Sequence, residues 1–299
     1  MNCLALSRDK LLLAAGGNPA IRLYDTISAT RTPEQHISAS ITPTANILPI
    51  HVFEGHQGNV LAVGFHADCK WMWMVSESGE LRLWDLQDEF ACIKEIAVGP
   101  ATTTAVLHPA QEEVLVGDEM GNIRFWNLAS GQCIGEIKGR ERVAIRDVAV
   151  SPDGMLIAAL DHRGCLRVWK VSNLVRIAEK ASYEVSLLGS VDAHLKYGIK
   201  CQFSPDSTML LTTSADATAK LWTIDCNSTE PTLVLTQEFL GHTKWVWDCA
   251  FSADSAYVIT ASSDESVRLW DAASGAMIAI YVGHSKAVTC IALNDFPVL

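Results

Sequence analysis

The chain has 299 residues, of which 49% are hydrophobic and 19% are charged, a composition too apolar for an intrinsically disordered protein. Its 23 Lys and Arg stand against 34 Asp and Glu, and the net charge of −11 argues against a nucleic-acid-binding surface. No apolar run approaches the roughly 20 residues of a membrane-spanning helix, so we expect no membrane insertion and a cytoplasmic location. Nine scattered cysteines without a C-x-x-C pair predict reduced thiols, and neither a disulfide framework nor a structural zinc site.

A short alternating pattern recurs six times along the chain. In each copy an aromatic residue follows a basic residue by two positions, and this alternation predicts a strand with one buried face. The copies cover residues 21–25, 81–85, 123–127, 166–170, 219–223 and 267–271. Turn-forming sequences precede several copies, for example at residues 151–154, 204–207 and 252–255.

Each unit of about 43 residues predicts four short strands, a length typical of one blade of a β-propeller. In the sixth unit the strands are expected over residues 246–251, 257–261, 267–270 and 277–282. The pattern resembles the WD repeat, so we expect an all-β WD-repeat β-propeller that is a single domain over residues 1–299. Two stretches break the period and predict insertions, residues 26–47 in the first repeat and residues 171–186 in the fourth.

Histidine, serine, aspartate and tryptophan recur together in several units. The set could suggest a hydrolase triad, but a catalytic triad would not be copied around a ring. The resemblance to WD repeats implies a structural network in which Asp orients His, His bonds Ser and Ser reaches the indole N–H. The expected members are His242, Ser262, Asp264 and Trp270 in repeat six, His194, Ser214, Asp216 and Trp222 in repeat five, and His56, Ser76 and Trp84 in repeat two, where Ser78 replaces the acid.

The sequence contains no nucleotide-binding, nucleophile–base or metal-ligand motif. We therefore expect no catalytic residue, no metal, no cofactor and no enzymatic activity. A propeller binds partners mainly through the loops that enter its innermost strands, where Trp, Tyr and Arg are common hot-spot residues. The expected partner-binding residues flank the first inward residue of these strands, and they are Trp245, Trp247, Tyr197, Ile199, Asn59, Leu61 and Arg146. The alternative for Trp245 and Trp247 is packing into neighbouring loops.

Several longer stretches carry a closer resemblance, namely residues 64–72, 107–118, 201–208, 245–252 and 283–290. They resemble the small WD-repeat, G-protein-β-subunit-like subunit of TOR kinase complexes over residues 2–295. The resemblance implies a non-enzymatic scaffold that binds and stabilises the TOR kinase domain, joins other TOR-complex subunits and supports growth and nutrient signalling. It also implies that Trp245 and Trp247 lie near the kinase contact. The alternative is a generic WD-repeat adaptor in a ubiquitin ligase or a G-protein-like signalling complex.

Members of this family have seven blades, whereas six units are complete in this chain. Residues 283–295 add one more histidine signal and one more inner strand. We therefore expect six complete repeats plus one C-terminal closing strand, with the first blade missing at the N-terminus. Two explanations stay open, a gene model truncated at its start or a short form with an open or strained ring.

Overall fold

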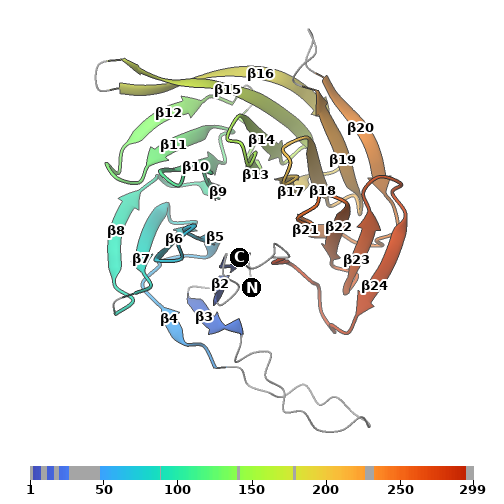
Figure 1. The fold of residues 1–299 in the computed structure, drawn as a ribbon, viewed down its shortest axis with the longest axis horizontal. Coiled ribbons are helices and arrows are strands. Elements are labelled where there is room, and N and C mark those ends of the chain that lie inside the picture. Colours follow the sequence, from blue (N-terminus) through green and yellow to red (C-terminus); the bar gives the residue numbers. More distant parts are fainter. Residues whose placement is uncertain are drawn as a thin grey trace.

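The computed structural model describes residues 3–7, 12–16, 20–26, 48–87, 89–139, 142–177, 180–225 and 232–293. Within these residues, 24 strands form six four-stranded sheets that stand as blades around a central channel (Figure 1). Within each sheet, every strand pairs antiparallel with the next strand in the chain, so every blade is a simple meander from the channel outward. The predicted all-β propeller is therefore confirmed.

The blades follow one another in chain order. Blade 1 contains β1 (Cys3–Leu6), β2 (Leu12–Gly16), β3 (Ile21–Asp25) and β4 (His51–Phe53); blade 2 contains β5 (Val60–Phe65), β6 (Trp71–Ser76), β7 (Glu80–Asp85) and β8 (Cys92–Ala97); blade 3 contains β9 (Thr102–Leu107), β10 (Glu113–Asp118), β11 (Ile123–Asn127) and β12 (Cys133–Ile137). Blade 4 contains β13 (Ile145–Val150), β14 (Leu156–Asp161), β15 (Cys165–Ile177) and β16 (Lys180–Asp192); blade 5 contains β17 (Gly198–Phe203), β18 (Met209–Ser214), β19 (Ala219–Asp225) and β20 (Thr232–Phe239); blade 6 contains β21 (Val246–Phe251), β22 (Tyr257–Ser262), β23 (Ser266–Asp271) and β24 (Met277–Val282).

The six aromatic-ended patterns form the third strand of each blade, as the period-two alternation predicts. In β7, for example, Leu81 and Leu83 are buried while Arg82 between them is partly exposed. The predicted insertion in the fourth repeat is a continuation of this ladder. Strands β15 and β16 remain paired from Val171–Val185 to Ile177–Lys180, which lengthens the outer hairpin of blade 4. Residues 27–47 of the other predicted insertion lie outside the described residues.

Apolar clusters between successive blades form the core. At the junction of blades 5 and 6, Leu211 and Leu221 pack against Phe251, Val258 and Trp270. Equivalent clusters join blades 1 and 2, 2 and 3, 3 and 4, and 4 and 5. In the described part of the chain no such cluster joins blade 6 to blade 1, and the ring is open between them (Figure 1).

The C-terminal segment does not form the predicted closing strand. Residues 283–293 have no ladder partner, and the family's count of seven blades is not confirmed among the described residues. The segment nevertheless contacts blade 6. The Val288 amide donates to the Ser262 carbonyl oxygen at 3.1 Å, and the Ile291 amide donates to Asp248 Oδ2 at 2.6 Å. Cys3 and Leu293, the first and last described residues, both line the channel.

Candidate interaction sites at the top face and the channel

We call the side of the ring on which the innermost strands begin the top face. The first residues of β5, β13, β17 and β21 are buried, namely Val60, Ile145, Gly198 and Val246. The predicted partner-binding residues on either side of them fall into two groups. Leu61, Arg146, Ile199 and Trp247 follow the buried residue and line the channel. Asn59, Tyr197 and Trp245 precede it and lie in the loops that enter the strands.

Four aromatic rings lie in contact across the top of blades 4, 5 and 6. His162 stacks on Tyr197 with ring centroids 5.0 Å apart and an interplanar angle of 4°. Tyr197 meets Trp245 edge to face at 5.1 Å, and Trp245 lies 5.4 Å from Trp247. We call these four residues the aromatic row. Its members come from three blades, so the fold brings together side chains that are far apart in the sequence.

In blades 2 to 6, backbone hydrogen bonds place two residues of each blade side by side at the top face. The amide that follows the second strand donates to the carbonyl oxygen that precedes the first strand, as from Ser263 to Trp245 at 2.9 Å. The same bond joins Glu77 to Asn59, Glu119 to Ala101, His162 to Ala144 and Ala215 to Tyr197. His162 is not among the predicted partner-binding residues, because these were expected only on either side of the first residue of the innermost strand. The position after the second strand recurs in every unit and would have identified it.

The two tryptophans differ in their surroundings. Trp247 is half-buried, and its indole Nε1 donates to Ser263 Oγ at 2.6 Å. Trp245 remains 38% exposed although it touches both Tyr197 and Trp247. Packing into neighbouring loops thus describes Trp247 better than Trp245. An exposed indole next to other rings is a typical feature of a protein-binding surface.

The charge of the top face changes around the ring. Lys196 and Lys244 are exposed and lie in the loops that carry Tyr197 and Trp245. Leu195, which directly precedes Lys196 in the chain, also has an exposed side chain. Blades 2 and 3 instead expose the carboxylates Glu77 and Glu119 at the position of His162. The aromatic row therefore has a basic and apolar border, although the chain as a whole carries a net charge of −11.

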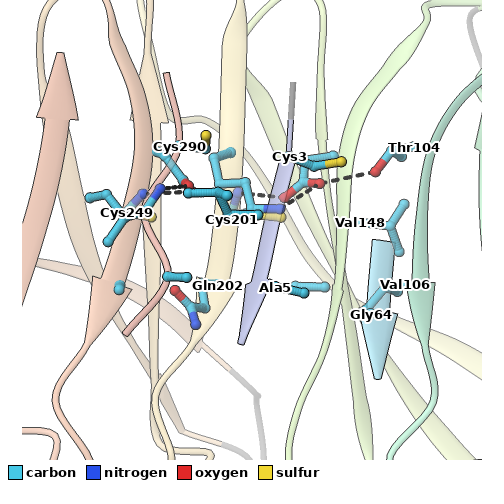
Figure 2. Close-up of a pocket in the computed structure, with 18 of the residues that line it drawn as sticks. Cys3, Ala5, Gly64, Thr104, Val106, Val148, Cys201, Gln202, Cys249 and Cys290 are labelled. Carbon is cyan, nitrogen blue, oxygen red and sulfur yellow. Dashed lines mark hydrogen bonds and ion pairs between the residues drawn. The ribbon is translucent and has the colours of Figure 1, made fainter. Parts of the chain in front are cut away.

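The channel contains a cavity of about 670 Å³ with charged groups in its wall. Asp147 accepts hydrogen bonds from Thr104 Oγ1 at 3.0 Å and the Cys201 amide at 2.9 Å, and it pairs with Lys200 at 3.3 Å (Figure 2). Burial raises the pKa of Asp248 to about 6, while the Lys200 ammonium opposes this shift. Figure 2 also shows Cys201, Cys249 and Cys290 around the same cavity.

The indole network of blades 5 and 6 runs through threonine. His194 Nδ1 lies 3.0 Å from Asp216 Oδ2, and His194 Nε2 lies 2.9 Å from Thr212 Oγ1. The Trp222 indole donates to the same Thr212 oxygen at 3.0 Å. Blade 6 repeats this arrangement with His242, Asp264, Thr260 and Trp270 at 2.8–2.9 Å. Burial would raise the pKa of both aspartates, but hydrogen bonds from histidine and from Thr218 or Ser266 outweigh it and lower the pKa.

The serine partners predicted for this network are therefore wrong. Ser214 Oγ accepts from the Asp216 amide at 3.0 Å and donates to the Tyr197 carbonyl oxygen at 3.0 Å. Ser262 bonds in the same way to the Asp264 amide and the Lys244 carbonyl oxygen. Serine and threonine lie two residues apart on the same face of the second strand, and the threonine is the one beside the indole. The serines instead hold the turn that carries the aspartate.

Blade 2 lacks this network. The Trp84 indole donates to Met74 Sδ at 3.1 Å, and Ser76 Oγ lies 2.7 Å from Ser78 Oγ. His56 is buried, and within the described residues neither of its ring nitrogens has a hydrogen-bond partner. Its nearest carboxylate oxygen belongs to Glu80, 3.6 Å from Nδ1. Burial, together with the nearby Arg82 guanidinium, lowers the pKa of His56 to about 4.

The described residues contain no group of three or more His, Cys, Asp and Glu side chains placed to hold a metal ion. The eight described cysteines are free thiols. No helix within the described ranges is long and apolar enough to cross a membrane.

Comparison with protein families finds the WD domain, G-beta repeat, at residues 48–85, 131–170, 185–223 and 233–271. These ranges fall in blades 2, 4, 5 and 6, and each also includes all or most of the strand that precedes its blade. The match therefore agrees with the propeller that the strands build.

Curated relatives align with nearly the whole chain. The protein named "Target of rapamycin complex subunit wat1" of Schizosaccharomyces pombe is 39% identical over 100% of this chain and 87% of its own length. The protein named "Target of rapamycin complex subunit LST8" of Bos taurus is 36% identical over 99% of this chain and 85% of its own length. "Target of rapamycin complex subunit LST8-1" of Arabidopsis thaliana is 38% identical over 75% of this chain. Because the matches to wat1 and bovine LST8 are 39% and 36% identical over at least 99% of this chain, and the chain carries the repeat, it belongs to the family of WD-repeat target of rapamycin complex subunits that includes wat1 and LST8.

Proposed function

We propose that this protein is a non-catalytic scaffold subunit that binds the catalytic region of the TOR kinase through the aromatic row. The observation that carries the proposal is the continuous contact of His162, Tyr197, Trp245 and Trp247 on one face of the ring. Relatives named as target of rapamycin complex subunits support the choice of partner. The propeller suits a binding role, because the histidine and aspartate of each candidate triad bond to each other and to a threonine of the indole network, not to the serine.

The chemistry of the row indicates what a partner segment must present. Tyrosine and tryptophan offer large, rigid contact areas at a small cost in conformational entropy. Lys196 and Lys244 border the rings with positive charge. A kinase segment with an apolar or aromatic side chain beside carboxylates would therefore match both the rings and their border.

Stabilisation of the kinase follows from binding to one of its conformations. The row spans three blades whose backbones are fixed by the same hydrogen bond at the top of each sheet. A segment held on this surface loses the freedom to adopt its disordered forms. A partner that binds only the ordered arrangement of the kinase shifts the equilibrium toward it by mass action. Support for growth and nutrient signalling and contact with other TOR-complex subunits belong to the same proposal.

The test is capture of TOR kinase from native cells by tagged Trp245→Ala protein. We expect a loss of kinase affinity of at least about tenfold, the effect of removing a hot-spot side chain, with an unchanged thermal midpoint. Ile93→Ala is the matched control, because Ile93 is an exposed apolar residue of blade 2 far from the row. Equal capture by Trp245→Ala and the control would refute the role of the row. Purification of the native protein without TOR would favour the adaptor alternative.

A further inference from the structure

A cavity of about 650 Å³ lies between the outer parts of blades 3 and 4, where β12 is next to β15 and β16 (Figure 1). Its wall also includes the turns that precede the third strands of both blades. Along β16 the lining residues run from Val185 to Asp192, a span of roughly 20 Å at about 3.3 Å per residue. We call this site the rim cavity. None of the four residues of the aromatic row lines it, so the two sites are separate.

The residue opposite the basic residue of the third strand differs between blades. In three blades it is a glutamate that pairs with the base, namely Glu95 with Arg82 at 3.4 Å, Glu136 with Arg124 at 3.1 Å and Glu238 with Lys220 at 3.3 Å. In blades 1 and 6 it is apolar, namely Val52 and Ile280. In blade 4 Ser190 lies opposite Arg167, and both residues line the rim cavity. Blade 4 therefore keeps the base but lacks the carboxylate of the fourth strand.

Blade 3 has a full set of polar partners around its base. Arg124 pairs with two carboxylates, because Asp118 Oδ2 lies 3.1 Å from its guanidinium in addition to Glu136. The side-chain amide of Asn122 donates to the same Asp118 oxygen at 3.0 Å. One aspartate, one glutamate and one carboxamide thus surround this arginine.

In blade 4 two of these partners are replaced by short side chains. Asp161 ends its second strand as Asp118 does, and its Oδ2 lies 3.3 Å from Arg167 Nη2. Cys165 takes the place of Asn122, since the backbone amide of each donates to Oδ1 of the aspartate four residues before it. Cys165 Sγ lies 3.4 Å from Ser190 Oγ. Among the described residues, Arg167 therefore pairs with one carboxylate where Arg124 pairs with two, and Asp161 Oδ2 is buried without a hydrogen-bond partner.

The wall of the rim cavity combines charged and apolar side chains. It contains as many cations as carboxylates, namely Lys138, Arg163 and Arg167 against Glu136, Asp161 and Asp192. Net charge therefore does not select a ligand, whereas the unfilled place beside Arg167 does. The apolar part of the wall includes Trp169 and Leu187, and Leu187 is 42% exposed. The cavity thus offers an anion contact next to an apolar contact.

We infer that the rim cavity binds an extended segment of a partner protein in which a glutamate or aspartate is next to an apolar residue. The carboxylate pairs with Arg167 beside Ser190, in the place that Glu136 occupies in blade 3. Arginine and carboxylate form strong, charge-assisted hydrogen bonds. The apolar residue contacts Trp169 and Leu187. A span of roughly 20 Å accommodates about six extended residues, which favours a peptide segment over a small carboxylate.

The probe is a fluorescein-labelled peptide with blocked ends and the sequence Ser-Leu-Glu-Leu-Ser-Gly. We expect saturable one-to-one binding to the full chain in fluorescence polarisation. The peptide with glutamine in place of glutamate should bind at least about tenfold more weakly, because a neutral amide forms a weaker hydrogen bond with a guanidinium than a carboxylate does. The measurement is made without TOR kinase, so its outcome is independent of the role of the aromatic row.

Ser190→Glu in the full chain tests the location of the site. The new carboxylate should pair with Arg167 as Glu136 pairs with Arg124, and it should weaken peptide binding at least about tenfold by filling the place of the ligand. Ser190 is exposed, so the thermal midpoint should not fall. Thr232→Glu is the matched control, because it makes the same change of charge at an exposed position on the fourth strand of blade 5. It should leave peptide binding unchanged.

Three results would overturn the inference. The first is equal binding of the glutamate and glutamine peptides, or no saturable binding of the glutamate peptide. The second is equal binding of the glutamate peptide to Ser190→Glu and to Thr232→Glu, which would place the peptide elsewhere on the molecule. The third is competition by N-acetylglutamate at the same concentration as the unlabelled peptide, because the ligand would then be a small carboxylate rather than an extended segment.

Discussion

Single side chains decide which blades carry the indole network. Met74 of blade 2 occupies the ladder position of Thr212 and Thr260, opposite a basic residue of the third strand. A thioether offers only a weak acceptor, so the Trp84 indole is poorly satisfied and His56 has no hydroxyl to bond. The buried imidazole of blade 2 is therefore kept neutral by its surroundings rather than by a paired aspartate.

This arrangement makes stability depend on pH through His56. Its pKa in the folded protein is about 4, below the usual histidine value of about 6.5, so the unfolded chain binds more protons between these two values. The contribution of His56 to the free energy of unfolding should fall as the pH drops from 6.5 to 4, by up to about 3 kcal/mol, and stay level above 6.5. Asp248, whose pKa burial raises to about 6, acts in the opposite direction in this window, so the His56 contribution is the difference between the two proteins compared below. Urea denaturation at several pH values measures this dependence. In His56→Gln the same window should show a smaller slope, and equal slopes in the two proteins would contradict the prediction.

Spacing along the sequence predicts the histidine of the network but not its hydroxyl partner. His56, His194 and His242 each precede the aromatic residue of their unit by 28 residues, and the structure places all three in buried positions. Thr212 and Ser214 are both hydroxyl residues on the same face of one strand. Only the three-dimensional position of the indole distinguishes them, and that position depends on packing between blades.

At the scale of elements, the C-terminal segment shows the limit of a repeat pattern. Residues 283–290 match the start of a unit, and this match predicts a strand. A strand is stable only when a neighbouring strand accepts and donates its hydrogen bonds. The described residues provide no such neighbour, so the segment follows the path of a strand without forming a ladder.

The carboxylate of Asp248 should therefore hold this segment in place. Asp248→Ala removes the acceptor of the Ile291 amide and should free the segment from blade 6. Loss of a hydrogen bond to a charged group costs about 1.5–3 kcal/mol, so trypsin cleavage after Lys286 should accelerate by roughly tenfold or more.

Asp147→Ala is the control for this experiment. It removes the equivalent bond to the Cys201 amide at the junction of blades 4 and 5. Cleavage after Lys286 should then keep the rate of the unmodified chain. The same cleavage rate in Asp248→Ala and Asp147→Ala would show that Asp248 does not hold the segment.

At the scale of the whole molecule, six blades are joined in series by five apolar junctions within the described residues. A linear array of repeats opens most easily at its ends, because each end unit has one neighbour instead of two. The amides of β2 and β22 in the end blades should therefore exchange with solvent at least about tenfold faster than those of β14 in blade 4. Hydrogen exchange followed by mass spectrometry measures this gradient. Uniform protection of all six blades would instead indicate a ring that opens as one unit.

The repeated strands of this molecule can be predicted from the sequence, whereas the contacts between blades cannot. Six third strands are visible because each has its own alternation and its own aromatic residue. The contact of His162 with Tyr197 joins two blades, so no local pattern contains it. Whether one domain spans residues 1–299 remains a prediction, as does the role of the partner-binding residues.

An open ring has a mechanical property that a closed one lacks. A closed propeller fixes its own circumference, because every blade is held on both sides. In the six described blades, which five apolar junctions join in series, small rotations at successive junctions would add together, so their combined curvature would change with little distortion of any single blade. The aromatic row crosses two of these junctions. A ligand that contacts all four aromatic side chains would therefore fix the curvature of blades 4, 5 and 6, and with it the width of the channel mouth.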